Sequence, residues 1–321
     1  MLGRTGKSYD GGDDAEPSAG LKGGESTDAP GRRLTAWAKI NLGLWVGPRQ
    51  ADGYHLVDTV LAEVSLADVI EVEPGPTWTV VTDGPFALDL VDPAQHSVTR
   101  AQVALTAEDP TWPSGWHVRV RKQIPPAAGL GGGSMDAAAW LRFAAELRPQ
   151  LAPALPVLAR GIGADVAFGL VGGIARGQGR GDRLTLLRAA GVRGRGVVLA
   201  NPGWPMATAA VYAALDQVAA EGAGPSVAAL VRALEAGEWD LPWDNGLERA
   251  AWAVQPRLRE FKAWLDAQGA SGRWWLSGSG ATYYALVEDV EEARALLLRL
   301  QKARVPWAAA GEVAPRAHPG P

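Results

Sequence analysis

The alternation of apolar and polar residues predicts β-strands in the first half of the chain. LTAWAKINLGLWV, residues 34–46, alternates well enough for a strand, and WHVRVRKQIP, residues 116–125, alternates strictly before it stops at Pro125. Between these segments, residues 56–74 predict a strand, a turn and a second strand, and a D-G pair just before them predicts a loop. Residues 97–108 predict a helix.

The second half of the chain mixes short strands with helices. An alanine-rich amphipathic helix is predicted from near Ser134, and a shorter helix around residues 152–160. Because the later strands are short and alternating, the pattern favours a two-domain α+β fold over a parallel, doubly wound sheet. These strands are predicted at residues 196–202, 274–280 and 282–288, and the accompanying helices at residues 207–219, 225–236, 246–268 and 289–301.

We predict that the chain is organised in three parts. Residues 1–31 are rich in Gly, Asp, Ser and Pro and contain almost no large apolar side chains. Such a segment cannot bury enough surface to offset the entropy lost on ordering, so we expect a disordered extension. Residues 32–183 and residues 184–321 are then expected to form the two domains.

Composition narrows the classes of function. The chain has 321 residues, a net charge of −4, no cysteines and four histidines. The net charge does not indicate a basic surface that would bind nucleic acid. Because cysteines are absent and histidines are few, the composition argues against disulfides and against a zinc site. No apolar run is long enough to span a membrane. We therefore expect a cytoplasmic protein that binds neither nucleic acid nor a membrane.

A glycine-rich loop is the most informative local feature. The run Gly129-Leu130-Gly131-Gly132-Gly133-Ser134 leads directly into the predicted helix. Glycines let backbone N–H groups turn towards an anion, and a helix N-terminus adds free donors and partial positive charge. The run has neither the lysine of a P-loop nor G-x-G-x-x-G spacing. The residues alone leave two interpretations: a phosphate cradle, or a flexible loop with Ser134 as an ordinary helix cap.

Pro125, three residues and this glycine run resemble the ATP-binding motif of the GHMP kinase superfamily, which contains galacto-, homoserine, mevalonate and phosphomevalonate kinases. Further blocks, in the order found in that superfamily, are Gly163-Ala164-Asp165-Val166 and Leu276-Ser277-Gly278-Ser279-Gly280-Ala281-Thr282. The resemblance implies two α/β domains with the active site in the cleft between them, and ATP and Mg²⁺ as cofactors. It also implies residues that bind ATP (Pro125, Gly129, Leu130, Gly131, Gly132, Gly133 and Ser134) and a third glycine motif (Gly278, Ser279 and Gly280).

Lys39 and Asp165 are the candidate catalytic residues. From the residues alone, Asp165 is either a helix or turn cap or a carboxylate held at a site, and Lys39 is either a solvent-facing lysine on a strand or part of a site. The resemblance implies that Asp165 is the general base or orienter for a hydroxyl, with the Lys39 ammonium beside it. Asn41 lies two residues on, on the same face of the strand, where it could bind the acceptor or a phosphate. No side chain is assigned to a metal ion.

Two further blocks are Ala38-Lys39-Ile40-Asn41-Leu42 and Asp52-Gly53-Tyr54-His55. They resemble one branch of the superfamily in particular, the branch that acts on cytidine-diphosphate methylerythritol. This resemblance implies that Tyr54 and Tyr212 sandwich the cytosine, since aromatic stacking on a base contributes about 1–3 kcal/mol. It also implies that His55 reads the base edge and that Thr208 lies in the same substrate site. A helical tyrosine such as Tyr212 can equally be part of a core.

We therefore expect an ATP-dependent kinase that phosphorylates the 2-hydroxyl of its cytidine-diphosphate methylerythritol substrate, in the non-mevalonate route to isoprenoid precursors. The alternatives are a GHMP kinase that acts on a different alcohol or acid, and a non-catalytic nucleotide-binding relative. The first alternative predicts loss of the cytosine reader, and the second predicts loss of Lys39 or Asp165. All of these residues are present. The sequence is compatible with a monomer or a homodimer.

Overall fold

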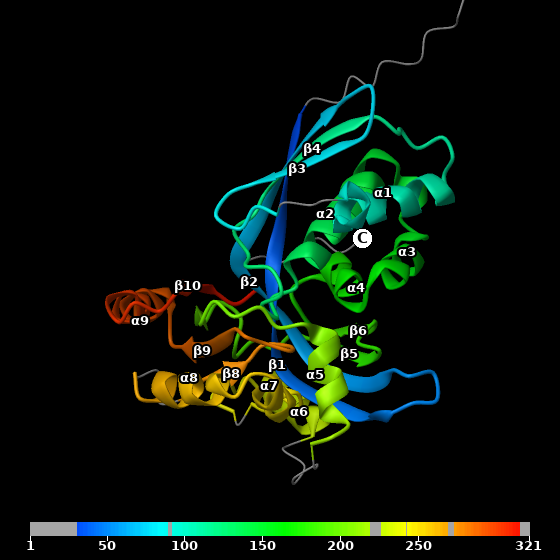
Figure 1. Ribbon diagram of the computed structural model, residues 1–321. Helices are drawn as coiled ribbons and strands as arrows, with labels where there is room; N and C mark the ends of the chain where they lie inside the picture. Colours follow the sequence, from blue (N-terminus) through cyan, green and yellow to red (C-terminus); the bar gives the residue numbers. More distant parts are fainter. Residues whose placement is uncertain (1–30, 89–91, 219–225, 242, 269–272, 315–321) are drawn as a thin grey trace, which may run out of the picture.

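The computed structural model describes residues 31–88, 92–218, 226–241, 243–268 and 273–314. A long antiparallel hairpin runs through the molecule (Figure 1) and is made of β1 (Arg32–Arg49) and β2 (His55–Pro74). Its turn carries the predicted D-G pair and is closed by a hydrogen bond from Gln50 N–H to Tyr54 O, at 2.7 Å. Apart from Gly31, the predicted disordered extension lies outside the described residues.

The turn predicted within residues 56–74 is wrong, because this segment is one continuous strand. β1 pairs with β2 along its whole length. The opposite edge of β2 pairs with β4 (Trp116–Arg121) at Val69–Pro74 and with β5 (Ile174–Gly179) at Val57–Ala62. Polar residues in the middle of the segment, Glu63 and Asp68, are buried within the sheet.

The first sheet contains β1 and β2 together with four shorter strands. Its order is β3-β4-β2-β5-β6, with β1 on β2, and only β3 and β4 pair in parallel. The shorter strands are β3 (Thr79–Asp83), β4 (Trp116–Arg121), β5 (Ile174–Gly179) and β6 (Arg183–Leu186). The predicted boundary between residues 183 and 184 falls inside β6, and the division into domains stays a prediction.

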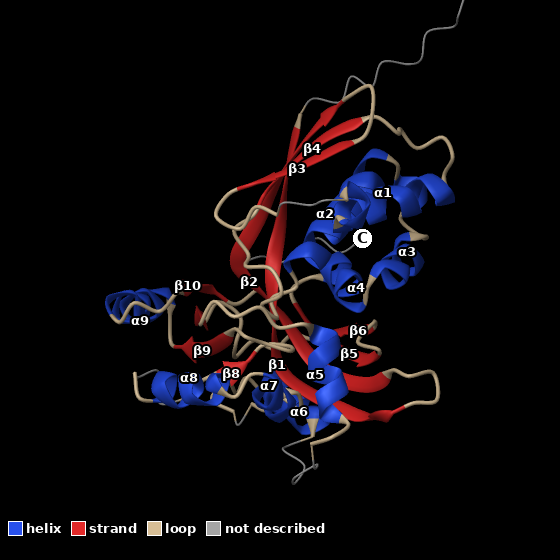
Figure 2. Cartoon of the chain, in the orientation of Figure 1, coloured by secondary structure: helices blue, strands red, loops and turns tan. Residues whose placement is uncertain are grey.

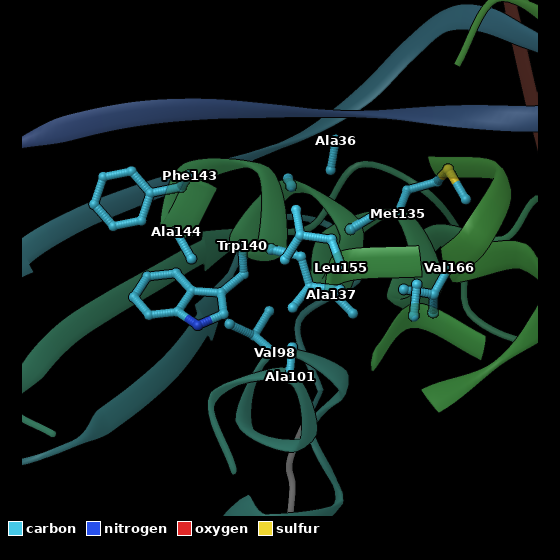
Figure 3. Packing of buried hydrophobic residues seen from close by; sticks show 14 of the residues in the cluster. Ala36, Val98, Ala101, Met135, Ala137, Trp140, Phe143, Ala144, Leu155 and Val166 are labelled. Carbon is cyan, nitrogen blue, oxygen red and sulfur yellow. The ribbon is translucent and has the colours of Figure 1, made fainter. Parts of the chain in front are cut away.

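Four helices cover one face of this sheet (Figure 2): α1 (Ser97–Glu108), α2 (Gly132–Leu147), α3 (Leu155–Ile162) and α4 (Ala164–Val171). Short 3₁₀ helices lie at Pro93–Gln95 and Pro149–Leu151. Aromatic packing is prominent in the core beneath them: Trp116, Trp140 and Phe143 lie edge to face or tilted, with ring centroids 5.3–5.8 Å apart. Figure 3 shows Trp140 and Phe143 among the buried apolar side chains around α2. Aromatic pairs of this geometry stabilise a core beyond their buried area.

A second sheet, with the order β10-β7-β9-β8, is antiparallel throughout. Its strands are β7 (Gly196–Asn201), β8 (Trp275–Leu276), β9 (Tyr283–Val287) and β10 (Trp307–Glu312). The accompanying helices are α5 (Thr208–Leu215), α6 (Val227–Glu235), α7 (Glu248–Val254), α8 (Arg257–Asp266) and α9 (Val290–Lys302). The single helix predicted over residues 246–268 is two helices, because Pro256 lacks an N–H and disfavours helical geometry in the residue before it.

The two sheets meet along the β1–β2 hairpin. The Tyr284 hydroxyl donates to Asn41 O at 3.0 Å, and Ala314 N–H donates to Glu63 O at 2.8 Å. The expected α+β fold is confirmed, and the hairpin brings the middle of β1 against both halves of the molecule. Within the described part of the chain, none of the helices combines the length and the apolarity that crossing a membrane requires.

Candidate active site

A cleft of about 570 Å³ lies where the hairpin, the glycine loop, α2, α4 and α5 meet. Most of the predicted site residues line it: Lys39, Asn41, Pro125, Gly129, Gly131, Gly132, Gly133, Ser134, Asp165, Thr208, Tyr212, Gly278 and Ser279. Four predicted residues, Tyr54, His55, Leu130 and Gly280, are not among the lining residues. Strand residues of the first sheet, together with α5 and the loop between β8 and β9 from the second half of the chain, therefore form its walls.

The glycine loop opens α2 without a side-chain cap. Gly131 is the N-cap residue, with φ of +72°, and the first backbone hydrogen bond of the helix runs from Met135 N–H to Gly131 O at 2.9 Å. The N–H groups of residues 132–134 therefore have no partner within the helix. Ser134 lies inside the first turn and does not cap it, so the ordinary-cap interpretation is wrong. Free donors and the helix dipole make this end of α2 suited to an anion.

Lys39 runs between the two glycine-rich loops. Its backbone N–H donates to Leu130 O at 3.0 Å, and its side chain is almost fully buried. A Cβ added at Gly131 would lie 3.0 Å from Lys39 Cγ, and one added at Gly278 would lie 3.2 Å from Lys39 Nζ. Because these contacts are shorter than ordinary van der Waals distances, the lysine stem fills the space that the missing side chains leave.

The Lys39 ammonium meets Asp165 and Asn41 at the centre of the cleft. Nζ lies 3.5 Å from Asp165 Oδ2 and donates to Asn41 Oδ1 at 2.9 Å. Asn41 Nδ2 donates in turn to Thr59 Oγ1 at 2.9 Å, which orients the amide. Asp165 is in the first turn of α4, where the helix dipole stabilises a carboxylate, and its side chain is 37% exposed. A fixed cation thus lies beside an accessible carboxylate.

The third glycine motif is fastened to the glycine loop and to α5. Ser277 Oγ donates to Gly129 O at 2.9 Å, and the Thr208 and Ser279 hydroxyls lie 2.9 Å apart. Asn245, which the sequence reasoning missed, donates from Nδ2 to Leu276 O at 2.7 Å and to Gly278 O at 2.9 Å. The motif is therefore held from three sides.

Tyr212 projects from α5 into the cleft, next to His55. The two ring centroids are 5.5 Å apart and the planes are tilted by 46°. Burial, reinforced by the charge of Asp165, raises the pKa of Tyr212 to about 12, so its hydroxyl stays protonated. His55 Nδ1 lies 2.8 Å from Gly47 O, and Nε2 lies 3.4 Å from Asp216 Oδ1. Both ring nitrogens of His55 therefore face protein oxygens.

Tyr54 lies at the tip of the hairpin, beside a residue that the sequence left unassigned. The Arg180 guanidinium carbon is 3.9 Å from the Tyr54 ring centroid, and Arg180 also pairs with Asp52 at 2.8 Å. The hydrogen bond from Tyr54 N–H, followed by Arg180, lowers the pKa of Asp52. Arg180 lines the cleft, so it connects the exposed Tyr54 to the site.

At the opposite end, the cleft is lined by further residues that were not predicted, including His96, Ser97, Lys122 and Asp136. His96 caps α1, since its Nδ1 accepts from Val98 N–H at 3.2 Å. Burial, together with the charge of Lys122, lowers the pKa of His96 to about 4, which keeps this ring neutral. Among the described residues there is no group of three or more His, Cys, Asp or Glu side chains that could hold a metal ion.

Comparison with known proteins places this arrangement in a class. The model of the GHMP kinases N terminal domain matches residues 96–175, and that of the GHMP kinases C terminal domain matches residues 232–305. A homoserine kinase from Cytophaga hutchinsonii shares the fold at a TM-score of 0.63 and 16% identity, covering 90% of this chain and 95% of its own. The fold is that of the GHMP kinases.

Relatives with higher sequence identity define the family within that class. A 4-diphosphocytidyl-2-C-methyl-D-erythritol kinase from Rhizorhabdus wittichii is 37% identical over 85% of this chain and 91% of its own length. The kinase of that name from Thermus thermophilus is 38% identical over 80% of this chain and 88% of its own. A crystal structure of 4-(cytidine 5′-diphospho)-2C-methyl-D-erythritol kinase superposes with a TM-score of 0.71 at 35% identity, covering 88% of this chain and 99% of that chain. The chain belongs to the 4-diphosphocytidyl-2-C-methyl-D-erythritol kinase family.

Proposed function

We propose that this protein transfers the γ-phosphoryl group of ATP to the 2-hydroxyl of 4-diphosphocytidyl-2-C-methyl-D-erythritol, in the methylerythritol phosphate route to isoprenoid precursors. The observation that carries the proposal is the approach of Lys39 Nζ to within 3.5 Å of Asp165 Oδ2, beside Gly131 in the cleft. The names of the relatives, which match over most of the chain, supply the substrate.

Asp165 and Lys39 would act on the acceptor hydroxyl. Asp165 is the exposed carboxylate next to the glycine loop, so it is placed to accept the hydroxyl proton while the alcohol oxygen attacks the γ-phosphorus. The bond between the γ-phosphorus and the β–γ bridging oxygen breaks, and ADP leaves. The buried Lys39 ammonium offsets negative charge on the transferring group, and Asn41 keeps that ammonium in place.

The open end of α2 would bind the nucleotide phosphates through the N–H groups of residues 132–134. Mg²⁺ usually keeps several waters and is held by substrate phosphates with one or two carboxylates. The Asp165 carboxylate and the Ser134 hydroxyl line the cleft beside the proposed phosphate site and could supply oxygen ligands to an ion bound mainly through ATP. Bound there, the ion would neutralise phosphate charge.

Tyr212, Tyr54 and His55 would form the cytosine site. Tyr212 offers a neutral ring at the cleft, and Arg180 covers one face of Tyr54, which leaves the other face for a base. Because the His55 ring nitrogens face Gly47 O and Asp216, we expect the backbone of His55 to contribute to reading the base edge.

The test is a phosphoryl-transfer assay with ATP, Mg²⁺ and the cytidine substrate, in which ³¹P NMR identifies the product. The same assay with homoserine, mevalonate or methylerythritol 4-phosphate tests the alternative acceptors. We expect Asp165→Asn to lower kcat by roughly 10²- to 10⁴-fold, since it removes the proton acceptor, with ATP affinity nearly unchanged. Turnover of another acceptor in preference to the cytidine substrate, or a fully active Asp165→Asn variant, would count against the proposal.

A further inference from the structure

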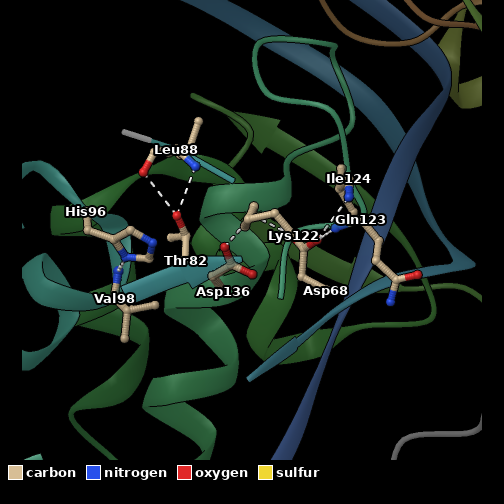
Figure 4. A network of polar contacts seen from close by, with 9 residues as sticks. All are labelled: Asp68, Thr82, Leu88, His96, Val98, Lys122, Gln123, Ile124 and Asp136. Atoms are coloured by element: carbon tan, nitrogen blue, oxygen red, sulfur yellow. Dashed lines mark hydrogen bonds and ion pairs between the residues drawn. The ribbon is translucent and has the colours of Figure 1, made fainter. Parts of the chain in front are cut away.

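An ion pair closes the base of the glycine loop. Lys122 follows β4 and stands just before the loop, and Asp136 lies in the first part of α2, just after it. Lys122 Nζ donates to Asp136 Oδ2 at 2.6 Å, so two residues that flank the loop in sequence are joined by their side chains (Figure 4). The loop residues 123–135 lie between these two anchors.

Asp68 of β2 fastens the same ion pair to the sheet. Its Oδ2 accepts from Lys122 Nζ, and its Oδ1 accepts from the backbone N–H groups of Gln123 at 2.5 Å and Ile124 at 2.9 Å. A Cβ added at Gly132 would lie 3.5 Å from Asp68 Oδ2, so the carboxylate lies directly against the start of α2. Strand, loop entry and helix are thus tied at one point.

These three side chains are among the most buried charged groups described. Asp68 and Asp136 are 0% exposed and Lys122 is 3% exposed, yet Lys122 and Asp136 line the cleft. Burial alone would lower the pKa of Lys122, but the charges of Asp136 and Asp68 outweigh it and raise that pKa. The ammonium therefore stays charged and donates to an oxygen of each acid, although burial raises the pKa of Asp136 to about 7. Buried ion pairs are no more stabilising than apolar packing, so stability alone does not account for one here.

We propose that Lys122, Asp136 and Asp68 form a clasp that positions the glycine loop and the first turn of α2 to receive the phosphates of the nucleotide. The clasp rests on the proposed function, because the site that it would position is the one proposed for the nucleotide phosphates. It acts through the loop N–H groups rather than by touching substrate. An open N-terminus binds an anion well only if its donors are held in place before binding. The clasp supplies this order at the base of a loop that is rich in flexible glycine.

The decisive measurement is the Kd of ATP for the full chain, by titration calorimetry with Mg²⁺ and without the second substrate. Asp136→Ala leaves Lys122 paired only with Asp68 and frees the helix side of the loop. We expect its Kd to rise by roughly 10- to 100-fold, because small misplacements of positioning groups have large effects, while the KM of the cytidine substrate changes little. Asp136→Asn keeps an oxygen that accepts from Lys122, so it should restore most of the affinity.

The matched control is at the other end of the same helix. Asp109 pairs with Arg148, which directly follows α2, and neither residue lines the cleft. Asp109→Ala should lower thermal stability without changing the Kd of ATP. Should Asp136→Ala fail to fold, Asp136→Ser provides a second variant, since its hydroxyl stops short of the ammonium.

An unchanged Kd in the folded Asp136 variants would overturn the clasp while leaving the kinase proposal intact. An equal loss of ATP affinity in Asp109→Ala would also overturn it, because a general loosening of α2 would then suffice. If the wild-type chain bound no ATP at all, the proposed function and the clasp would both be wrong. A rise in the Kd of ATP that is confined to Asp136→Ala or Asp136→Ser, with the affinity for ATP recovered in Asp136→Asn, supports the clasp.

Discussion

Replacing Gly131 by alanine tests the geometry of the site with the smallest possible change. Gly131 is in the left-handed region, with φ of +72°, where a residue with a Cβ costs about 1–2 kcal/mol. The new methyl would lie 3.0 Å from Lys39 Cγ and 3.2 Å from Lys39 Cε. These atoms belong to a flexible stem, so the fold should survive while the lysine moves aside.

The effect on catalysis should exceed the effect on stability. The strain of 1–2 kcal/mol corresponds to a fall of only a few degrees in Tm for a chain of this size. Lys39 Nζ lies 3.5 Å from Asp165 Oδ2, and a displacement of about 1 Å at a reacting centre reduces rate by about 100-fold. We therefore expect kcat to fall by roughly 10- to 100-fold in Gly131→Ala, with a folded protein at assay temperature.

Gly194→Ala is the matched control. Gly194 has φ of +77°, yet a Cβ added there has no atom within 4 Å, so the backbone strain is the same and nothing is pushed aside. Steady-state kinetics at saturating ATP and cytidine substrate, with thermal melts, compare the two variants. If both lose the same stability and both keep wild-type kcat, the inference that the missing side chain of Gly131 makes room for a positioned lysine is refuted.

Three further changes test other parts of the structure. Arg180→Ala removes the guanidinium 3.9 Å from Tyr54, an exposed contact of about 0.5–1 kcal/mol, so the KM of the cytidine substrate should rise two- to fivefold and that of ATP should not; equal changes in both would contradict this. Asn245→Ala removes two buried hydrogen bonds to the third glycine motif and should lower the unfolding free energy by about 2 kcal/mol in urea titrations; an unchanged midpoint would reject the role. Burial raises the pKa of Glu248 from 4.5 to about 7, so its contribution to stability is present below pH 4.5 and is lost as pH rises through 7. Glu248→Gln should therefore be more stable than wild type at pH 8, by at most about 3 kcal/mol, but not at pH 4, and parallel pH curves in urea would disprove the shift.

Local patterns predicted the elements that build the site. Strict alternation in residues 116–125 and the glycine run before an alanine-rich helix both correspond to observed elements, β4 and α2. The expectation that Asn41 shares a face with Lys39 follows from strand geometry, and the two side chains are hydrogen-bonded. These features depend on neighbours in sequence, which is why they could be predicted.

The clasp was missed although the same alternation contains a signal for it. In β4, Trp116, Val118 and Val120 face the core, and Lys122 continues that face. In β2, Asp68 likewise precedes the buried Ile70 on one face of the strand. A charged residue at an apolar register position has to be paired when it is buried, so two such residues of opposite sign indicate a pair. Predicting a turn within residues 56–74, where the structure has one continuous strand, hid this signal.

Contacts between distant segments could not be predicted in this way. Arg180 covers Tyr54 because β5, which ends at Gly179, pairs with the hairpin strand β2, and Asp216 reaches His55 because α5 ends near the hairpin tip. Both contacts join residues far apart in sequence and depend on how a loop leaves a strand or helix. Neither has a pattern of spacing that a single sequence displays.

The glycines of the two loops serve different physical purposes. A Cβ at Gly129 would lie 2.0 Å from Ser277 O, so this glycine is required by the close contact between the loops, whatever binds in the cleft. Gly131 is required instead by its positive φ and by the lysine stem beside it. Richness in glycine is therefore weak evidence for a phosphate site by itself. The uncapped start of α2 next to a buried lysine is the stronger evidence, because packing between the loops requires neither feature.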